Sequence, residues 1–130
     1  MNIFKSVVLI LIIAFVSSCN EESTDLVSKW RLIEQLADPG DGSGTFQPVT
    51  SNKMIEFYDD GTITSNGSIC TLSITTDFPS NGTYNSSTME IELEDCVGGH
   101  APLSYEMLGQ HLILNYPCIE ACREKYEQVE

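Results

Sequence analysis

The residues from Lys53 to Ser65 read KMIEFYDDGTITS and contain two short runs rich in β-branched and aromatic residues. Asp59-Asp60-Gly61 separates the runs, and an Asp-Gly pair supplies the positive φ angles that a tight hairpin turn requires. The stretch therefore predicts a strand over 53–58, a turn, and an antiparallel partner strand over 62–65. This hairpin indicates an antiparallel all-β fold.

The same kind of pattern continues on both sides of this hairpin. Trp30, Leu32 and Leu36 have the even spacing of one strand face. The run Met89–Glu94 alternates apolar residues with carboxylates. Further strands are predicted over 28–36, 71–75, 83–84, 89–94, 103–107, 111–116 and 123–129, with Asn66-Gly67, Asn81-Gly82 and Gly109 as turns. Eight or nine short strands without a convincing helix predict a meander closed into a sandwich or a barrel.

The N-terminus has the layout of a secretory signal. Lys5 precedes an apolar run over 7–16, which is too short for a membrane-spanning helix of about 20 residues. The tetrapeptide Val16–Cys19 that follows resembles the processing site of bacterial lipoproteins. The resemblance implies cleavage before Cys19 and acylation of its thiol, for example by palmitate, so that lipid anchors the chain. We expect a signal peptide over 1–18, a flexible acidic tether over 19–27 and one domain over 28–130.

The charge of the chain restricts its partners. Six Lys and Arg stand against nineteen Asp and Glu, which gives a formal net charge of −13. Cleavage of the predicted signal removes Lys5, its one charged residue, and changes −13 to −14. Such a surface repels nucleic acid and anionic lipid headgroups. The lipid rather than the charge must therefore hold the protein at a membrane, and a basic protein would be attracted.

Four cysteines follow Cys19, and an even number in a small exported domain indicates disulfides. Residues four apart on a strand are separated by about 13 Å, whereas bonded cysteines need Cα atoms within about 7 Å. A bond between Cys118 and Cys122 therefore requires a turn, which Pro117 favours. Of three possible pairings we predict Cys118–Cys122 and Cys70–Cys96. Zinc is the alternative, but no second close cysteine pair and no histidine at ligand spacing supports it.

No arrangement of residues predicts catalysis. His100 lies in a glycine-rich loop, and His111 lies on a predicted strand opposite its apolar neighbours, so neither is placed as a base. The carboxylates of Glu90, Glu92 and Glu94 are typical of a solvated strand face rather than of a glycosidase cleft. We expect no enzyme activity, no cofactor and no metal. A calcium site in the loop Asp38–Gly44 is the alternative for that glycine-rich turn.

Several segments are similar to the lipocalin-like domain lipoproteins of Gram-negative bacteria. They are Lys29–Leu32, Asp38–Phe46, Ile55–Thr62 and Cys118–Tyr126. The resemblance spans most of 26–129 and implies a small antiparallel up-and-down barrel of about eight strands with a cavity, and no catalytic residue. It also implies a place in the cell envelope, at the outer membrane.

Two functions follow from these patterns. In the first, the barrel interior binds a small apolar ligand. The predicted ligand-binding residues are Trp30, Leu32, Phe57, Ile74, Leu93, Tyr105 and Leu112. In the second, the acidic surface binds another protein, for example a basic hydrolase such as lysozyme that it inhibits. The identity of the ligand or the partner stays open at this point.

Overall fold

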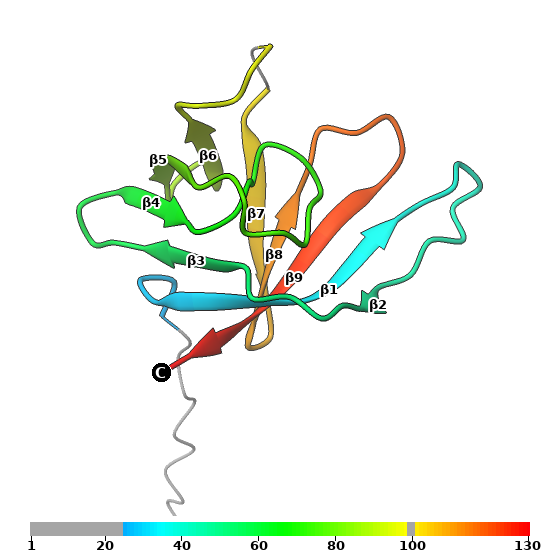
Figure 1. Cartoon of the computed structure of the whole chain (residues 1–130), viewed down its shortest axis with the longest axis horizontal. Helices are drawn as coiled ribbons and strands as arrows, with labels where there is room; N and C mark the ends of the chain where they lie inside the picture. The colour runs from blue at the N-terminus through cyan, green and yellow to red at the C-terminus, as the bar shows by residue number, and fades with distance from the viewer. Residues whose placement is uncertain (1–24, 99–100) are drawn as a thin grey trace, which may run out of the picture.

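The computed structural model describes residues 25–98 and 101–130 (Figure 1). In this part of the chain the elements are β1 (Lys29–Ala37), β2 (Gln47–Pro48), β3 (Met54–Phe57), β4 (Thr62–Ser65), β5 (Ser80–Asn85), β6 (Glu90–Leu93), β7 (Leu103–Leu108), β8 (His111–Asn115) and β9 (Cys122–Val129). The described residues contain no helix long and apolar enough to span a membrane.

The strands form one closed antiparallel barrel. β1 pairs with β3, each later strand pairs with the next one, and β9 returns to pair with β1 along almost its whole length. β2 contributes only two residue pairs to the far part of β1 and lies outside this circle. Eight strands therefore make the barrel, which confirms the predicted small up-and-down fold. The predicted signal peptide lies outside the described residues.

The two ends of the barrel differ. Four long connections, 38–53, 66–79, 94–102 and 116–121, leave the barrel at one end, which we call the loop end. The tight turns 58–61, 86–89 and 109–110 lie at the other end, which we call the hairpin end, together with the entering segment 25–28 and the C-terminus. In Figure 1 the long connections occupy the upper and right-hand side, and the C-terminus lies at the lower left.

The core lies inside the barrel, where inward-facing side chains from nearly all strands meet. Trp30, Ile55, Ile63, Ile91 and Leu112 are each 0% exposed. The predicted hairpin is present, since Tyr58 accepts a hydrogen bond from the backbone N–H of Gly61, whose φ is 85°. The predicted alternation is confirmed within β6, because Ile91 points inward while Glu90 and Glu92 are exposed. Met89, predicted on the same face as Ile91, instead lies in the turn before β6 with a φ of 56° and is 52% exposed.

A β-bulge changes the inward face of β1. Leu32 pairs with Tyr126, but Glu34 pairs with Lys125, so Ile33 is the extra residue on β1. Because one inserted residue exchanges the two faces of a strand, Leu36 does not share a face with Trp30 and Leu32. The even spacing of these three residues therefore gave a wrong prediction for Leu36. Gln35 takes the inward position instead.

The predicted strand over 71–75 is also wrong. This segment belongs to the long connection 66–79. The hydroxyl of Ser73 accepts a hydrogen bond from the backbone N–H of Thr75, a local turn that competes with a strand. The backbone N–H and C=O of Ser73 bond to buried side chains rather than to a neighbouring strand.

Asn81-Gly82 is not a turn, contrary to the prediction, but part of β5. Gly82 pairs with Leu93 of β6, and a Cβ atom at Gly82 would lie 2.1 Å from the backbone oxygen of Glu92. A glycine inside a strand is often placed where another backbone approaches closely. The glycine at this position therefore reflects the contact between β5 and β6 rather than a positive φ angle.

Candidate functional site

A buried ion pair lies beneath the loop end. Lys53 precedes β3, Glu124 lies on β9, and both side chains are fully buried. The ammonium of Lys53 donates to the two carboxylate oxygens of Glu124 at 3.0 and 2.9 Å and to the carbonyl of Ser73 at 2.9 Å. Burial lowers the pKa of Lys53, although the charge of Glu124 acts in the opposite direction. All three ammonium donors therefore have acceptors inside the protein.

The Glu124 carboxylate accepts further hydrogen bonds. The amide of Gln35 donates to it at 2.8 Å, the backbone N–H of Ser73 at 3.2 Å and the hydroxyl of Tyr116 at 2.6 Å, and the hydroxyl of Tyr126 also donates. Burial, followed by the charge of Glu124, raises the pKa of both tyrosines well above the ordinary value. No buried side-chain nitrogen or oxygen of the described residues lacks a partner. The cluster therefore fastens the connection 66–79 to the barrel.

Sequence patterns gave only a weak signal for this cluster. Glu124 lies between Cys122 and Tyr126 at the even spacing of one strand face. A carboxylate among these inward-facing positions was the one indication of a buried charge. Lys53 was predicted only as the first residue of the strand 53–58, whereas β3 begins at Met54. The pairing of these two residues depends on barrel closure, which joins segments 71 positions apart.

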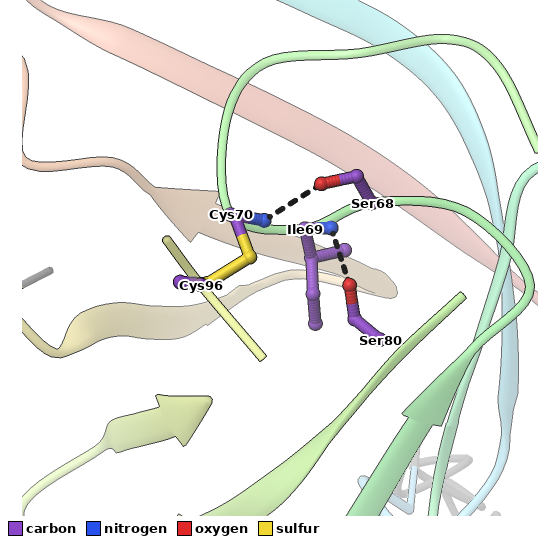
Figure 2. Close-up of a disulfide and its surroundings, with 5 residues drawn as sticks. All are labelled: Ser68, Ile69, Cys70, Ser80 and Cys96. Carbon is purple, nitrogen blue, oxygen red and sulfur yellow. Dashed lines mark hydrogen bonds between the residues drawn. A yellow bond between two sulfur atoms is a disulfide. The ribbon is translucent and has the colours of Figure 1, made fainter. Parts of the chain in front are cut away.

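The disulfide between Cys70 and Cys96 joins two of the long connections, and its Cα atoms lie 5.5 Å apart. Figure 2 shows the bond beside Ile69, which is fully buried in the core. The backbone N–H of Ile69 donates to the hydroxyl of Ser80 at 3.1 Å, and that of Cys70 donates to the hydroxyl of Ser68 at 3.3 Å. This part of the connection is therefore fixed both covalently and by packing, and the predicted pairing is confirmed.

The disulfide between Cys118 and Cys122 closes the connection 116–121 into a small loop, with Cα atoms 6.0 Å apart. The backbone N–H of Tyr116 donates to the carbonyl of Cys122 at 3.0 Å. The backbone N–H of Asp38 donates to the carbonyl of Ala121 at 2.8 Å, which joins this loop to its neighbour. The second predicted disulfide is therefore also confirmed, and the loop is rigidly supported on two sides.

The glycine-rich loop 38–44 is organised by the carboxylate of Asp38. This carboxylate accepts hydrogen bonds of 2.7–3.1 Å from four backbone N–H groups, those of Gly40, Asp41, Gly42 and Gly44. The N–H groups, that of Gly44 first, lower the pKa of Asp38. Within the described residues no group of three His, Cys, Asp or Glu side chains is placed to hold a metal ion. The loop geometry thus gives the calcium alternative no support.

The loop end exposes large apolar side chains. Ile74 is 43% exposed, Phe78 73% and Val97 93%, and Ile119 at the tip of the disulfide-closed loop is completely exposed. Exposed carboxylates lie in the same three connections and form no ion pair with any described residue; they are Asp77, Glu94, Asp95 and Glu120. Exposed apolar groups among polar neighbours often mark an interaction surface. We call these eight residues the loop-end surface.

A hollow of about 510 Å³ adjoins this surface on the outside of the barrel. Met89 and Ile119 contribute apolar groups to its wall, and Glu106, Asn115 and Arg123 contribute polar ones. Among the described lysines and arginines, Arg123 is the one without an ion-pair partner. The hollow is therefore open and of mixed polarity, unlike an enclosed apolar pocket.

The structure brings most of the predicted ligand-binding residues together, but as a packed core. Trp30, Leu32, Phe57, Tyr105 and Leu112 belong to the buried cluster, and Leu93 packs against it. Ile74 lies instead in the connection 66–79 and is exposed. Trp30 and Leu112 expose no surface even to a water molecule, so a ligand between them would require the core to separate. Binding of an apolar ligand stays a prediction, and the packing does not favour it.

The residues considered for catalysis are placed apart. His111 begins β8 at the hairpin end and is partly exposed, whereas His100 lies outside the described residues. Glu90 and Glu92 lie on the outer face of β6, and Glu94 follows that strand. These positions assemble no nucleophile with a base within the described chain.

Comparison of the chain with protein-family models, with curated protein sequences and with solved structures finds no match.

Proposed function

We propose that this chain is a lipid-anchored, non-catalytic lipoprotein of the cell envelope whose barrel binds a basic protein through the loop-end surface. The observation that carries the proposal is the exposure of four apolar side chains on three fastened connections. Because two disulfides and the Lys53–Glu124 pair fix these connections, binding would order few residues. Anchoring through Cys19 is part of the proposal, and it rests on the lipoprotein-like processing site.

Charge supports a basic partner. The net charge of −13 and the free carboxylates of the loop-end surface would attract a cationic protein over a long range. The apolar side chains would then provide the short-range contact, because burial of apolar surface is the main favourable term in most protein–protein association. The filled barrel interior favours this function over the transport of an apolar ligand.

The test uses lysozyme as the basic probe and the mature chain with Cys19→Ser. Calorimetry should show binding at about 0.01 M salt, where charges act over about 30 Å, and weaker binding at about 0.15 M, where they act over about 8 Å. Ile119→Asp should weaken the binding, whereas Leu108→Asp should not. Leu108 is a matched control because it is 60% exposed and lies at the hairpin end. No binding at low salt, or equal losses in both variants, would refute the proposal for lysozyme-like partners.

A further inference from the structure

The hairpin end has an apolar surface of its own. Leu108, the last residue of β7, is 60% exposed, and Met107 and Val27 are 37% and 39% exposed. Met107 and Leu108 end β7 at the turn 109–110, and Val27 belongs to the segment 25–28, which enters the barrel at the same end. We call Val27, Met107 and Leu108 the hairpin-end surface.

The chain also enters the barrel at this end. The indole N–H of Trp30 donates to the carbonyl of Leu26 at 3.1 Å, and the backbone N–H of Phe57 donates to the carbonyl of Ser28 at 3.0 Å. Leu26 packs against the core, so the segment 25–28 is part of the folded domain. Whatever is attached to the preceding residues is therefore held close to the hairpin end.

The distance from the proposed lipid to this end is short. Asp25 follows Cys19 by six residues, and a chain spans at most about 3.5 Å per residue, so the two lie within about 20 Å. This argument rests on the acylation of Cys19 in the proposed function. Acyl chains at Cys19 would keep the hairpin end within that distance of the bilayer surface.

We propose that the hairpin-end surface rests on a zwitterionic bilayer, with Leu108 in the interfacial layer and the loop end directed away from the membrane. The proposal names a zwitterionic lipid because the carboxylates of Asp59 and Asp60 lie in a turn at this same end. An anionic headgroup layer would repel these carboxylates, whereas zwitterionic headgroups do not. The lipid attached to the same chain raises the local concentration of the bilayer at this surface, so three partly exposed apolar side chains suffice for the contact.

The experiment compares Leu108→Trp with the control Val97→Trp in the full chain. Val97 is 93% exposed on the loop end, and Trp30, the single native tryptophan, is buried in both variants. Each protein is purified from the membranes of an expressing bacterium and reconstituted into vesicles of phosphatidylcholine containing brominated phosphatidylcholine, which quenches nearby indoles. We expect a blue shift and quenching of the new tryptophan in Leu108→Trp, and neither in Val97→Trp.

The outcomes separate this inference from the proposed function. Mass spectrometry of the purified chain reports whether Cys19 carries acyl groups, and their absence would overturn the anchoring together with this inference. An acylated chain in which neither variant is quenched, or both are quenched equally, would overturn the membrane contact alone. Replacing half of the phosphatidylcholine by phosphatidylglycerol should reduce the quenching of Leu108→Trp, and unchanged quenching would contradict the choice of a zwitterionic lipid.

Discussion

Replacing Lys53 by methionine removes the positive charge from the buried cluster and leaves its volume almost unchanged. The buried carboxylate of Glu124 would then lose its counter-ion, although four other donors still reach it. The carbonyl of Ser73 would lose its bond to the ammonium as well. Removing one partner of a buried ion pair costs about 3–5 kcal/mol, a large part of the 5–15 kcal/mol that stabilises a small domain. We expect a loss of that size in the free energy of unfolding.

Urea unfolding followed by the fluorescence of Trp30 measures this loss, because Trp30 is fully buried in the folded chain. The control is Lys29→Met, which breaks an exposed pair with Glu56 of 3.5 Å and should cost less than about 1 kcal/mol. The double variant Lys53→Met/Glu124→Gln should be more stable than Lys53→Met alone, since it removes the uncompensated charge. Equal effects of the substitutions at Lys53 and Lys29 would refute the reasoning, as would additivity in the double variant.

Three further predictions follow from the same structure. Replacing Cys70 and Cys96 by alanine should destabilise the fold by about 3–4 kcal/mol in urea unfolding, because the bond closes a loop between residues 26 apart. Gly82→Ala should unfold the domain or cost several kcal/mol, seen as a lower thermal midpoint, because its Cβ would lie 2.1 Å from a backbone oxygen of β6. Stability should fall as pH rises above about 10, because Tyr116 and Tyr126 keep their protons when folded and lose them when unfolded. Tyr116→Phe should flatten that decline in unfolding curves measured at several pH values, and an unchanged slope would contradict the raised pKa.

The pH prediction follows from the direction of each pKa. A folded-state pKa above the ordinary tyrosine value of 10.0 gives stability that is complete below pH 10 and is lost as pH rises towards the folded value. Lys53 acts in the opposite sense, because its folded pKa lies below 10.5 and the unfolded chain binds the proton more tightly. The stability gained from Lys53 therefore offsets part of the stability lost through the two tyrosines. The free energy of unfolding should still decrease as pH rises above about 10.

Local patterns predicted the parts of the fold that depend on neighbours in the sequence. The Asp59-Asp60-Gly61 turn and the alternation within 90–93 could be predicted because turn residues and period-two patterns act over a few positions. The two disulfides were readable because four cysteines allow only three pairings and Pro117 favours a turn. In each case the residues that determine the feature lie within it or are few enough to enumerate.

Features that depend on contacts between residues far apart in the chain could not be predicted from the sequence. The bulge at Ile33 changes which side chains of β1 face inward, and no residue type within β1 indicates that a bulge is present. The segment 71–75 alternates like a strand, but its backbone groups bond to Lys53 and Glu124 instead of another strand. The loop-end surface was missed for a similar reason, since Val97 and Ile119 share one end of the barrel only through the antiparallel order of β6 to β9. Of the predicted ligand-binding set, Ile74 alone is part of it.

The hydrogen bonds that Asp38 makes within the loop 38–44 affect how easily a protease can cut this segment. Its three glycines and its exposed position would mark it as an easy place to cut, since proteases need to draw several residues into an extended conformation. The carboxylate of Asp38 holds four backbone N–H groups of this loop, and a cut would require all four hydrogen bonds to open together. We therefore expect the single aspartate Asp38 to make this glycine-rich segment more resistant to proteolysis than its composition suggests.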